Sequence, residues 1–194
     1  MGGSMRPPVE YLRVGFGKRL LAVILDGIMM VALIFALAMV LVNMGVQTSM
    51  ISSEEIDQLY GVYSMLGIPE SQIDYILEIV QSMSFTSVIV GLLYSMIEMA
   101  IGSSPGKLVF GLKIAHADGR RGNVALFAKR WAVKHISSLL NFIALLPALA
   151  FFDYIAGFAS FVIFIGCFFA LGEARMALHD RVAQTAVFHK EDIQ

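Results

Sequence analysis

A run of 23 residues, Leu20 to Val42, is apolar apart from one charged side chain, that of Asp26. A helix of about 20 apolar residues crosses the ~30 Å hydrocarbon core of a bilayer. The run is too long for the apolar core of a secretory signal peptide, and no small-residue cleavage site follows it. We therefore expect a membrane-spanning helix at this position.

The composition of the whole chain agrees with a membrane protein. Of the 194 residues, 58% are hydrophobic and 15% are charged, against roughly 45–50% and 25% in average soluble proteins. A soluble fold with this excess would expose large apolar patches, which soluble monomers avoid. The single cysteine excludes a disulfide scaffold, and the net charge of −1 excludes a typical nucleic-acid binder.

Two further regions are apolar enough to enter a bilayer. Residues 85–101 contain Glu98 near their end, and residues 136–171 contain only Asp153 as a charged residue. The second region would extend about 54 Å as a helix, slightly short of two crossings, with a turn at Asp153. We predict an all-α polytopic membrane protein with four transmembrane helices, at about 20–42, 85–101, 136–152 and 154–171. Three spans with one re-entrant segment are the alternative.

The distribution of charge predicts the orientation of these spans. All lysines and arginines precede the first span, lie in the loop 102–134, or lie in the tail 172–194. The segment 43–84 has none, although it contains six acidic residues. Because positive residues stay on the cytoplasmic side, we expect cytoplasmic termini, a cytoplasmic loop and an outer segment at 43–84. Residues 1–194 then form a single membrane domain.

Local patterns predict structure outside the spans. Ser52 and Glu55 form a capping box at the start of an amphipathic helix, and Pro69 opens a second such helix in the outer segment. These two helices could form a structural cap or could gate the protein or bind a partner. In the loop, Asp118 and Gly119 are a strong turn signal after residues that alternate in polarity, which predicts a small β-excursion. From Asn123 the pattern favours an interfacial helix whose basic residues attract anionic lipid.

The sequence offers no catalytic or metal-binding set. The four histidines, which are His116, His135, His179 and His189, are scattered without ligand spacing, and Cys167 lies alone in an apolar region. We also find no nucleophile with a matching base. We therefore expect no metal, no cofactor and no enzymatic activity.

Asp26 is the most informative residue. A carboxylate at the centre of a spanning helix costs of order 2.5–3.5 kcal/mol, so it needs a partner or a wet cavity. Arg19 lies on the same helix face but about 10 Å away along the axis, which makes a direct pair unfavourable. We expect pairs between segments: Arg19 with Glu98 or Asp180, and Asp26 with Lys107, Arg130 or Arg181.

Two longer motifs resemble the RDD family of prokaryotic membrane proteins. They are residues 104–114, which read Ser-Pro-Gly-Lys-Leu-Val-Phe-Gly-Leu-Lys-Ile, and residues 178–187, which read Leu-His-Asp-Arg-Val-Ala-Gln-Thr-Ala-Val. The resemblance extends over residues 13–188 in outline. The family is named for one arginine and two aspartates, which by position correspond to Arg19, Asp26 and Asp180. The resemblance implies a prokaryotic inner-membrane protein; transport has been suggested for members, and some relatives are linked to sodium/proton antiport.

Two functions fit these features. The first is a small cation/proton antiporter in which Asp26 alternates between proton and cation, Arg19 adjusts its affinity, and Asp180 closes the cytoplasmic side. Glu98 is a further candidate for the ion or proton site. Four spans enclose little space, so we expect a homo-oligomer within the lipid bilayer. The alternative is a non-transporting assembly or interaction protein whose arginine and aspartates only hold the helices together.

Overall fold

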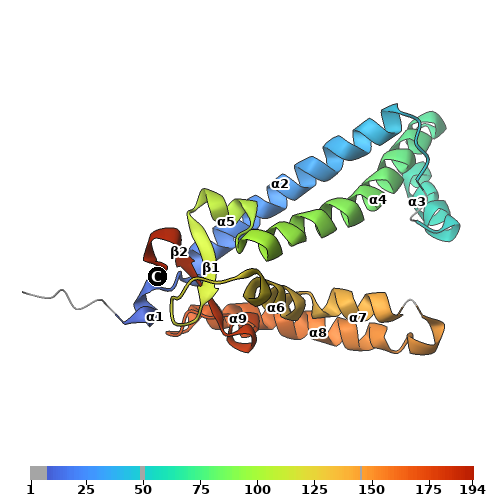
Figure 1. Cartoon of the computed structure of the whole chain (residues 1–194). Coiled ribbons are helices and arrows are strands. Elements are labelled where there is room, and N and C mark those ends of the chain that lie inside the picture. The colour runs from blue at the N-terminus through green and yellow to red at the C-terminus, as the bar shows by residue number, and fades with distance from the viewer. Residues whose placement is uncertain (1–7, 49–50, 145) are drawn as a thin grey trace, which may run out of the picture. The chain divides into compact units, whose positions relative to one another are not determined.

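The computed structural model describes residues 8–48, 51–144 and 146–194 (Figure 1). The chain divides into two compact units. One unit comprises residues 27–94. The other combines the chain up to Asp26 with the chain from Ser95 onwards. Both long helices of the first half, α2 (Phe16–Asn43) and α4 (Glu70–Ile101), have residues in each unit.

Three helices in the described part of the chain are long and apolar enough to cross a membrane. They are α2, α4, and the segment Phe152–Leu171, which consists of α8 (Phe152–Cys167) and the 3-10 turn η2 (Phe168–Leu171). Large apolar side chains on these helices are exposed, among them Val31 and Phe161. Exposed apolar surface on this scale suits lipid contact and not water. The protein is therefore a mainly helical membrane protein, as the sequence predicts.

The four-span prediction is not confirmed. Between the loop and α8, the structure has α7 (Ile136–Ala144) and the short turn η1 (Pro147–Leu149). Nine helical residues extend about 14 Å, less than half of the hydrocarbon core. Proline lacks an amide hydrogen and disfavours helical geometry in the residue before it, so Pro147 explains why no uninterrupted helix reaches residue 152. α7 lies against α8.

The unit of residues 27–94 contains α3 (Ser53–Met65), and its predicted capping box is present. The Ser52 side chain accepts from the Glu55 amide, and the Glu55 side chain accepts from the Ser52 amide. Gly67 then turns the chain with a φ of 74° before α4 begins. We expected separate helices over the second part of the outer segment and the second span. They form one helix instead, because no proline occurs between residues 70 and 101.

The second unit contains a two-stranded antiparallel sheet, β1 (Leu112–His116) and β2 (Thr185–His189), with Ile114 opposite Val187. The predicted turn at Asp118 is present, and Gly119 has a φ of 87°. After this turn, only Arg121 forms a bridge to β1. The main partner of β1 is thus a strand from the C-terminal tail, which lies beside it in Figure 1.

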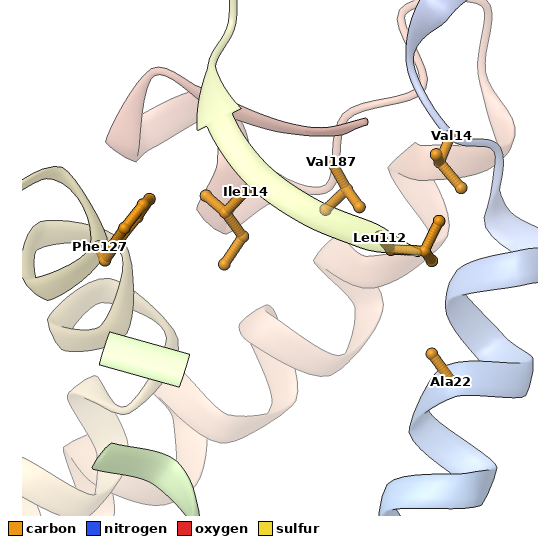
Figure 2. Close-up of a cluster of buried hydrophobic side chains, with 6 residues drawn as sticks. All are labelled: Val14, Ala22, Leu112, Ile114, Phe127 and Val187. Carbon is orange, nitrogen blue, oxygen red and sulfur yellow. The ribbon is translucent and has the colours of Figure 1, made fainter. Parts of the chain in front are cut away.

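A compact apolar cluster includes residues of both strands (Figure 2). Its members come from the chain just before α2, from the start of α2, from both strands and from α6 (Val124–Lys134): Val14, Ala22, Leu112, Ile114, Phe127 and Val187. The remaining short elements of this unit are α1 (Val9–Leu12), α5 (Pro105–Val109), α9 (Leu178–Ala183) and η3 (Lys190–Asp192). The cluster holds the beginning of α2 against the loop and the tail, where the polar side chains described next are found.

Candidate functional site

Arg19 is paired with an acid from another segment, as its helical spacing predicts. Its Nη1 donates to Oδ2 of Asp180 at 2.5 Å. The other guanidinium nitrogens donate to backbone carbonyls, Nε to Val14 at 2.9 Å and Nη2 to Arg175 at 2.7 Å. The arginine therefore joins the first turn of α2 to the tail at two points, Asp180 and Arg175, and also bonds the chain just before α2.

Asp180, in the first turn of α9, has no exposed surface. Its Oδ1 accepts from Nε of Arg130 at 2.8 Å, and its Oδ2 also accepts from the Ala177 amide at 3.2 Å. Burial alone would raise the pKa of this carboxyl, but the positive charges of Arg130 and Arg19 hold the pKa well below its usual range. Asp180 therefore stays ionised and does not exchange protons at physiological pH.

Glu98, near the end of α4, gathers three cations from two other elements. Nζ of Lys107 in α5 donates to Oε1 at 2.8 Å, and Nη1 of Arg130 in α6 donates to the same oxygen. Nζ of Lys134, also in α6, donates to Oε2 at 2.9 Å. Arg130 contacts both Glu98 and Asp180, so one guanidinium links α4, α6 and α9.

His179 extends this network, although its sequence position gave no sign of it. Its Nε2 lies 3.1 Å from Nη2 of Arg130. Burial and the charge of Arg130 lower the pKa of this imidazole to about 3, so it is neutral. Since Arg130 is always a donor, Nε2 accepts and Nδ1 carries the hydrogen. Nδ1 is buried and has no hydrogen-bond partner among the described residues.

Asp26 contacts the beginning of α5. Its Oδ2 accepts from the hydroxyl of Ser104 at 2.6 Å, and its Oδ1 accepts from the amide of Gly106 at 2.6 Å. Two of the cations that we expected beside Asp26, Lys107 and Arg130, donate to Glu98. The third, Arg181, lies over the ring of Phe169.

Gly106 makes this close approach possible. A Cβ at this position would collide with the backbone carbonyl of Ala22 and would lie 2.7 Å from Oδ1 of Asp26. Pro105 supplies the first residue of α5, and Ser104 caps the helix through the Lys107 amide. The motif Ser-Pro-Gly-Lys thus forms a short helix end that fits against α2. The sequence analysis singled out this motif, but it did not predict that the Gly106 amide donates to Asp26, because no side chain marks a backbone donor.

The geometry brings oxygen atoms together around Gly106: the carboxylate of Asp26, the hydroxyl of Ser104 and the carbonyl of Ala22. Hard oxygen ligands of this type suit alkali and alkaline-earth cations. In the described part of the chain, no three His, Cys, Asp or Glu residues are grouped as a metal site. Asp26, Arg19, Asp180 and Glu98 all lie in the same compact unit.

The sequence model of one family matches residues 13–184, a range that contains all of these residues. The chain belongs to the RDD family. Comparison with curated proteins and with solved structures gave no match. In this RDD protein, Arg19 and Asp180 form a direct ion pair, whereas Asp26 binds the Ser-Pro-Gly motif.

Proposed function

We propose that this RDD protein is a small cation/proton exchanger of the prokaryotic inner membrane and that Asp26 is its ion-binding carboxylate. The observation that supports this proposal is the group of oxygens around Gly106. The carboxylate of Asp26, on an apolar spanning helix, is contacted by the hydroxyl of Ser104 and lies near the carbonyl of Ala22. Ionisable groups at such positions commonly serve ion or proton pathways.

In this mechanism a proton and a cation compete for Asp26. The Ser104 hydroxyl and the Gly106 amide stabilise the ionised carboxylate through charge-assisted hydrogen bonds. Protonation weakens these bonds. When a cation binds, the Ser104 hydroxyl rotates and offers its oxygen as a ligand. Occupancy of the site is thereby transmitted to α5.

Arg19, Asp180, Arg130 and Glu98 have a different role in the proposal. Both acids are buried, and cationic side chains bind each of them. A cation that entered here would have to displace an arginine or a lysine. We therefore assign these four residues to a fixed frame that holds α2, α4, α6 and α9 on the cytoplasmic side, and not to the ion pathway.

The proposal includes a topology. We propose an even number of crossings, because an even number places every lysine- and arginine-rich segment on one side of the membrane. Both termini and the loop 102–134 are then cytoplasmic. The few helices of one chain enclose little space, so we propose that a homo-oligomer forms the pathway.

The test is cation-driven proton flux in liposomes. A sodium gradient should drive proton movement through the wild type, and Asp26→Asn should remove this flux while the protein remains folded in detergent. The matched control is Asp118→Asn, which removes an exposed acid whose partner is Arg120. Undiminished flux through a folded Asp26→Asn variant would exclude Asp26 from the pathway.

A non-transporting assembly protein is the second candidate. The observation that favours it is the complete engagement of Glu98 and Asp180 in ion pairs, which is typical of groups that fix packing. This candidate predicts that the wild type shows no flux with sodium, lithium or potassium. It further predicts that a partner protein co-purifies with the wild type and is lost from Arg19→Ala.

A further inference from the structure

We propose that a hollow beside the start of α2 is a binding site for a phosphate group, with the headgroup of an anionic phospholipid as its source. The hollow has a volume of about 460 Å³, within the range of ~300–1,000 Å³ typical of small-molecule sites. The proposal does not depend on the exchange function, because no lining residue belongs to the oxygen group around Gly106. The lining consists of residues 11–15, of Gly17 and Lys18 in α2, and of Arg175, His189 and Asp192 in the tail.

Two cationic side chains line the hollow without an acid as partner. Nζ of Lys18 lies 2.9 Å from Nε2 of His189, and because an ammonium group has only donors, the imidazole accepts. Nη1 of Arg175 donates to the carbonyls of Tyr11 and Arg13 at 3.1 and 3.0 Å. Neither Lys18 nor Arg175 forms an ion pair with a carboxylate of the described residues. An anion in the hollow would supply the charge that these two side chains lack.

The lining is positively charged in sum. Arg13, Lys18 and Arg175 contribute three positive charges, and Asp192 contributes one negative charge. Glu10, which is not part of the lining, lies 3.8 Å from Arg13 and offsets one more. A positive charge remains, and a positively charged hollow attracts anions.

Arg13 adds an unused hydrogen-bond donor to the wall of the hollow. The residue is only 9% exposed, and its Nη1 and Nη2 donate to the carbonyls of Ala174 and Ala117 at 3.1 and 2.8 Å. Its Nε is buried and has no hydrogen-bond partner among the described residues. Buried donors without an acceptor are rare and costly. A phosphate oxygen at the base of the hollow would offer such an acceptor.

Two glycines of the lining, Gly15 and Gly17, have no role in packing. A Cβ at either position would meet nothing within 4 Å, and neither residue has a positive φ. Glycine also allows a ligand to approach the backbone closely, and this is the use of glycine that remains here. The amides of the first turn of a helix lack partners within the helix and favour anions. α2 has no acidic residue in its first turn that could take this place.

The position of the hollow favours a lipid as the source of the phosphate. The apolar run of α2 begins at Leu20, only two residues after Lys18. Lipid phosphates lie directly outside the hydrocarbon core that this run suits. Lys18 and the first amides of α2 are therefore expected at the level of the headgroups. Inorganic phosphate has the same chemistry, so the experiment must distinguish the two sources.

The experiment is isothermal titration of the full-length protein, purified in a neutral detergent, with three probes. Dihexanoyl phosphatidic acid should bind saturably and at least about tenfold more tightly than zwitterionic dihexanoyl phosphatidylcholine, because only the first carries a net negative charge. Orthophosphate is the third probe. Weaker binding of orthophosphate than of phosphatidic acid supports a lipid source, and equal or tighter binding supports the site with a soluble phosphate as its source. No saturable binding of either anion, or equal affinity for the two lipids, would overturn the proposal.

Two variants test whether the bound anion occupies this hollow. Lys18→Met removes a charged donor and should weaken binding of phosphatidic acid about tenfold. Gly17→Ala places a methyl group where the protein leaves open space, so the midpoint of thermal unfolding should not fall, while binding should weaken. Unchanged affinity in either folded variant would refute the site.

The matched controls are Lys129→Met and Gly61→Ala. Lys129 is exposed on α6, and Gly61 lies in α3 with nothing within 4 Å of its Cβ. Both variants should bind phosphatidic acid as the wild type does. A loss of affinity in Lys129→Met as large as that in Lys18→Met would mean that the lipid is attracted by diffuse surface charge and would overturn the proposal.

Discussion

Nη1 of Arg19 lies 2.5 Å from Oδ2 of Asp180, although 161 positions separate the two residues in the chain. The carboxylate has no exposed surface, and Arg130 binds its other oxygen. Arg19 and Arg130 thus compensate the negative charge of a carboxylate that water does not reach. The pair connects the first turn of the first spanning helix to the C-terminal tail.

Removal of Asp180 should be severely destabilising. Asp180→Ala leaves Arg19 and Arg130 partly uncompensated in a buried region, and breaking such a pair costs about 3–5 kcal/mol. The expected result is a large drop in the midpoint of thermal unfolding in detergent. As a control, Asp118→Ala removes an exposed partner of Arg120 and should cost less than about 0.5 kcal/mol. Equal effects of the two substitutions would contradict a structural role for Asp180.

The decrease of folding stability at acidic pH should depend on His179. Because burial and Arg130 lower the pKa of this imidazole to about 3 in the folded protein, the unfolded chain binds more protons between about pH 3 and its ordinary pKa of about 6.5. Stability should therefore fall as pH decreases through this window. His179→Gln should flatten this slope, and His116→Gln, which lies outside the network, should not. Unfolding midpoints measured from pH 7 to pH 4.5 test the prediction; an unchanged slope in His179→Gln would exclude this residue as its source.

A methyl group at Gly106 should separate α5 from α2. In Gly106→Ala the new Cβ meets the Ala22 carbonyl and the Asp26 carboxylate, and overpacking of this kind typically costs about 1–3 kcal/mol. Gly61→Ala provides the opposite case, because Gly61 lies within α3 and its Cβ would meet nothing within 4 Å. That control should be neutral or slightly stabilising. The midpoints of thermal unfolding of the two variants test this prediction. Comparable midpoints would mean that Gly106 is not in tight contact with Ala22 and Asp26.

The pairing of Arg19 with an acid from another segment could be predicted because helix geometry fixes the distance to Asp26. That Arg19 pairs with Asp180 and not with Glu98 could not be predicted, since this choice depends on packing between segments far apart in sequence. The partner of β1 could not be predicted either. Alternating polarity indicates a strand, but no local pattern shows that its partner strand lies in the tail. The contacts of Asp26 with Ser104 and Gly106 were missed because these donors are a hydroxyl and a backbone amide, whereas electrostatic reasoning favoured cations.

The orientation in the membrane provides the final prediction. Lysine and arginine are absent from residues 43–84 but abundant in residues 102–134, so the positive-inside rule places these segments on opposite sides. Asp74 is exposed in α4, and Asp118 is exposed in the turn after β1. In a background where Cys167 is replaced by alanine, Asp74→Cys should react with a membrane-impermeant thiol reagent in intact cells. Asp118→Cys should react only after the cells are opened. Reaction of both variants in intact cells would place the two segments on the same side of the membrane. The chain between them would then cross the membrane an even number of times, and the predicted orientation would be wrong.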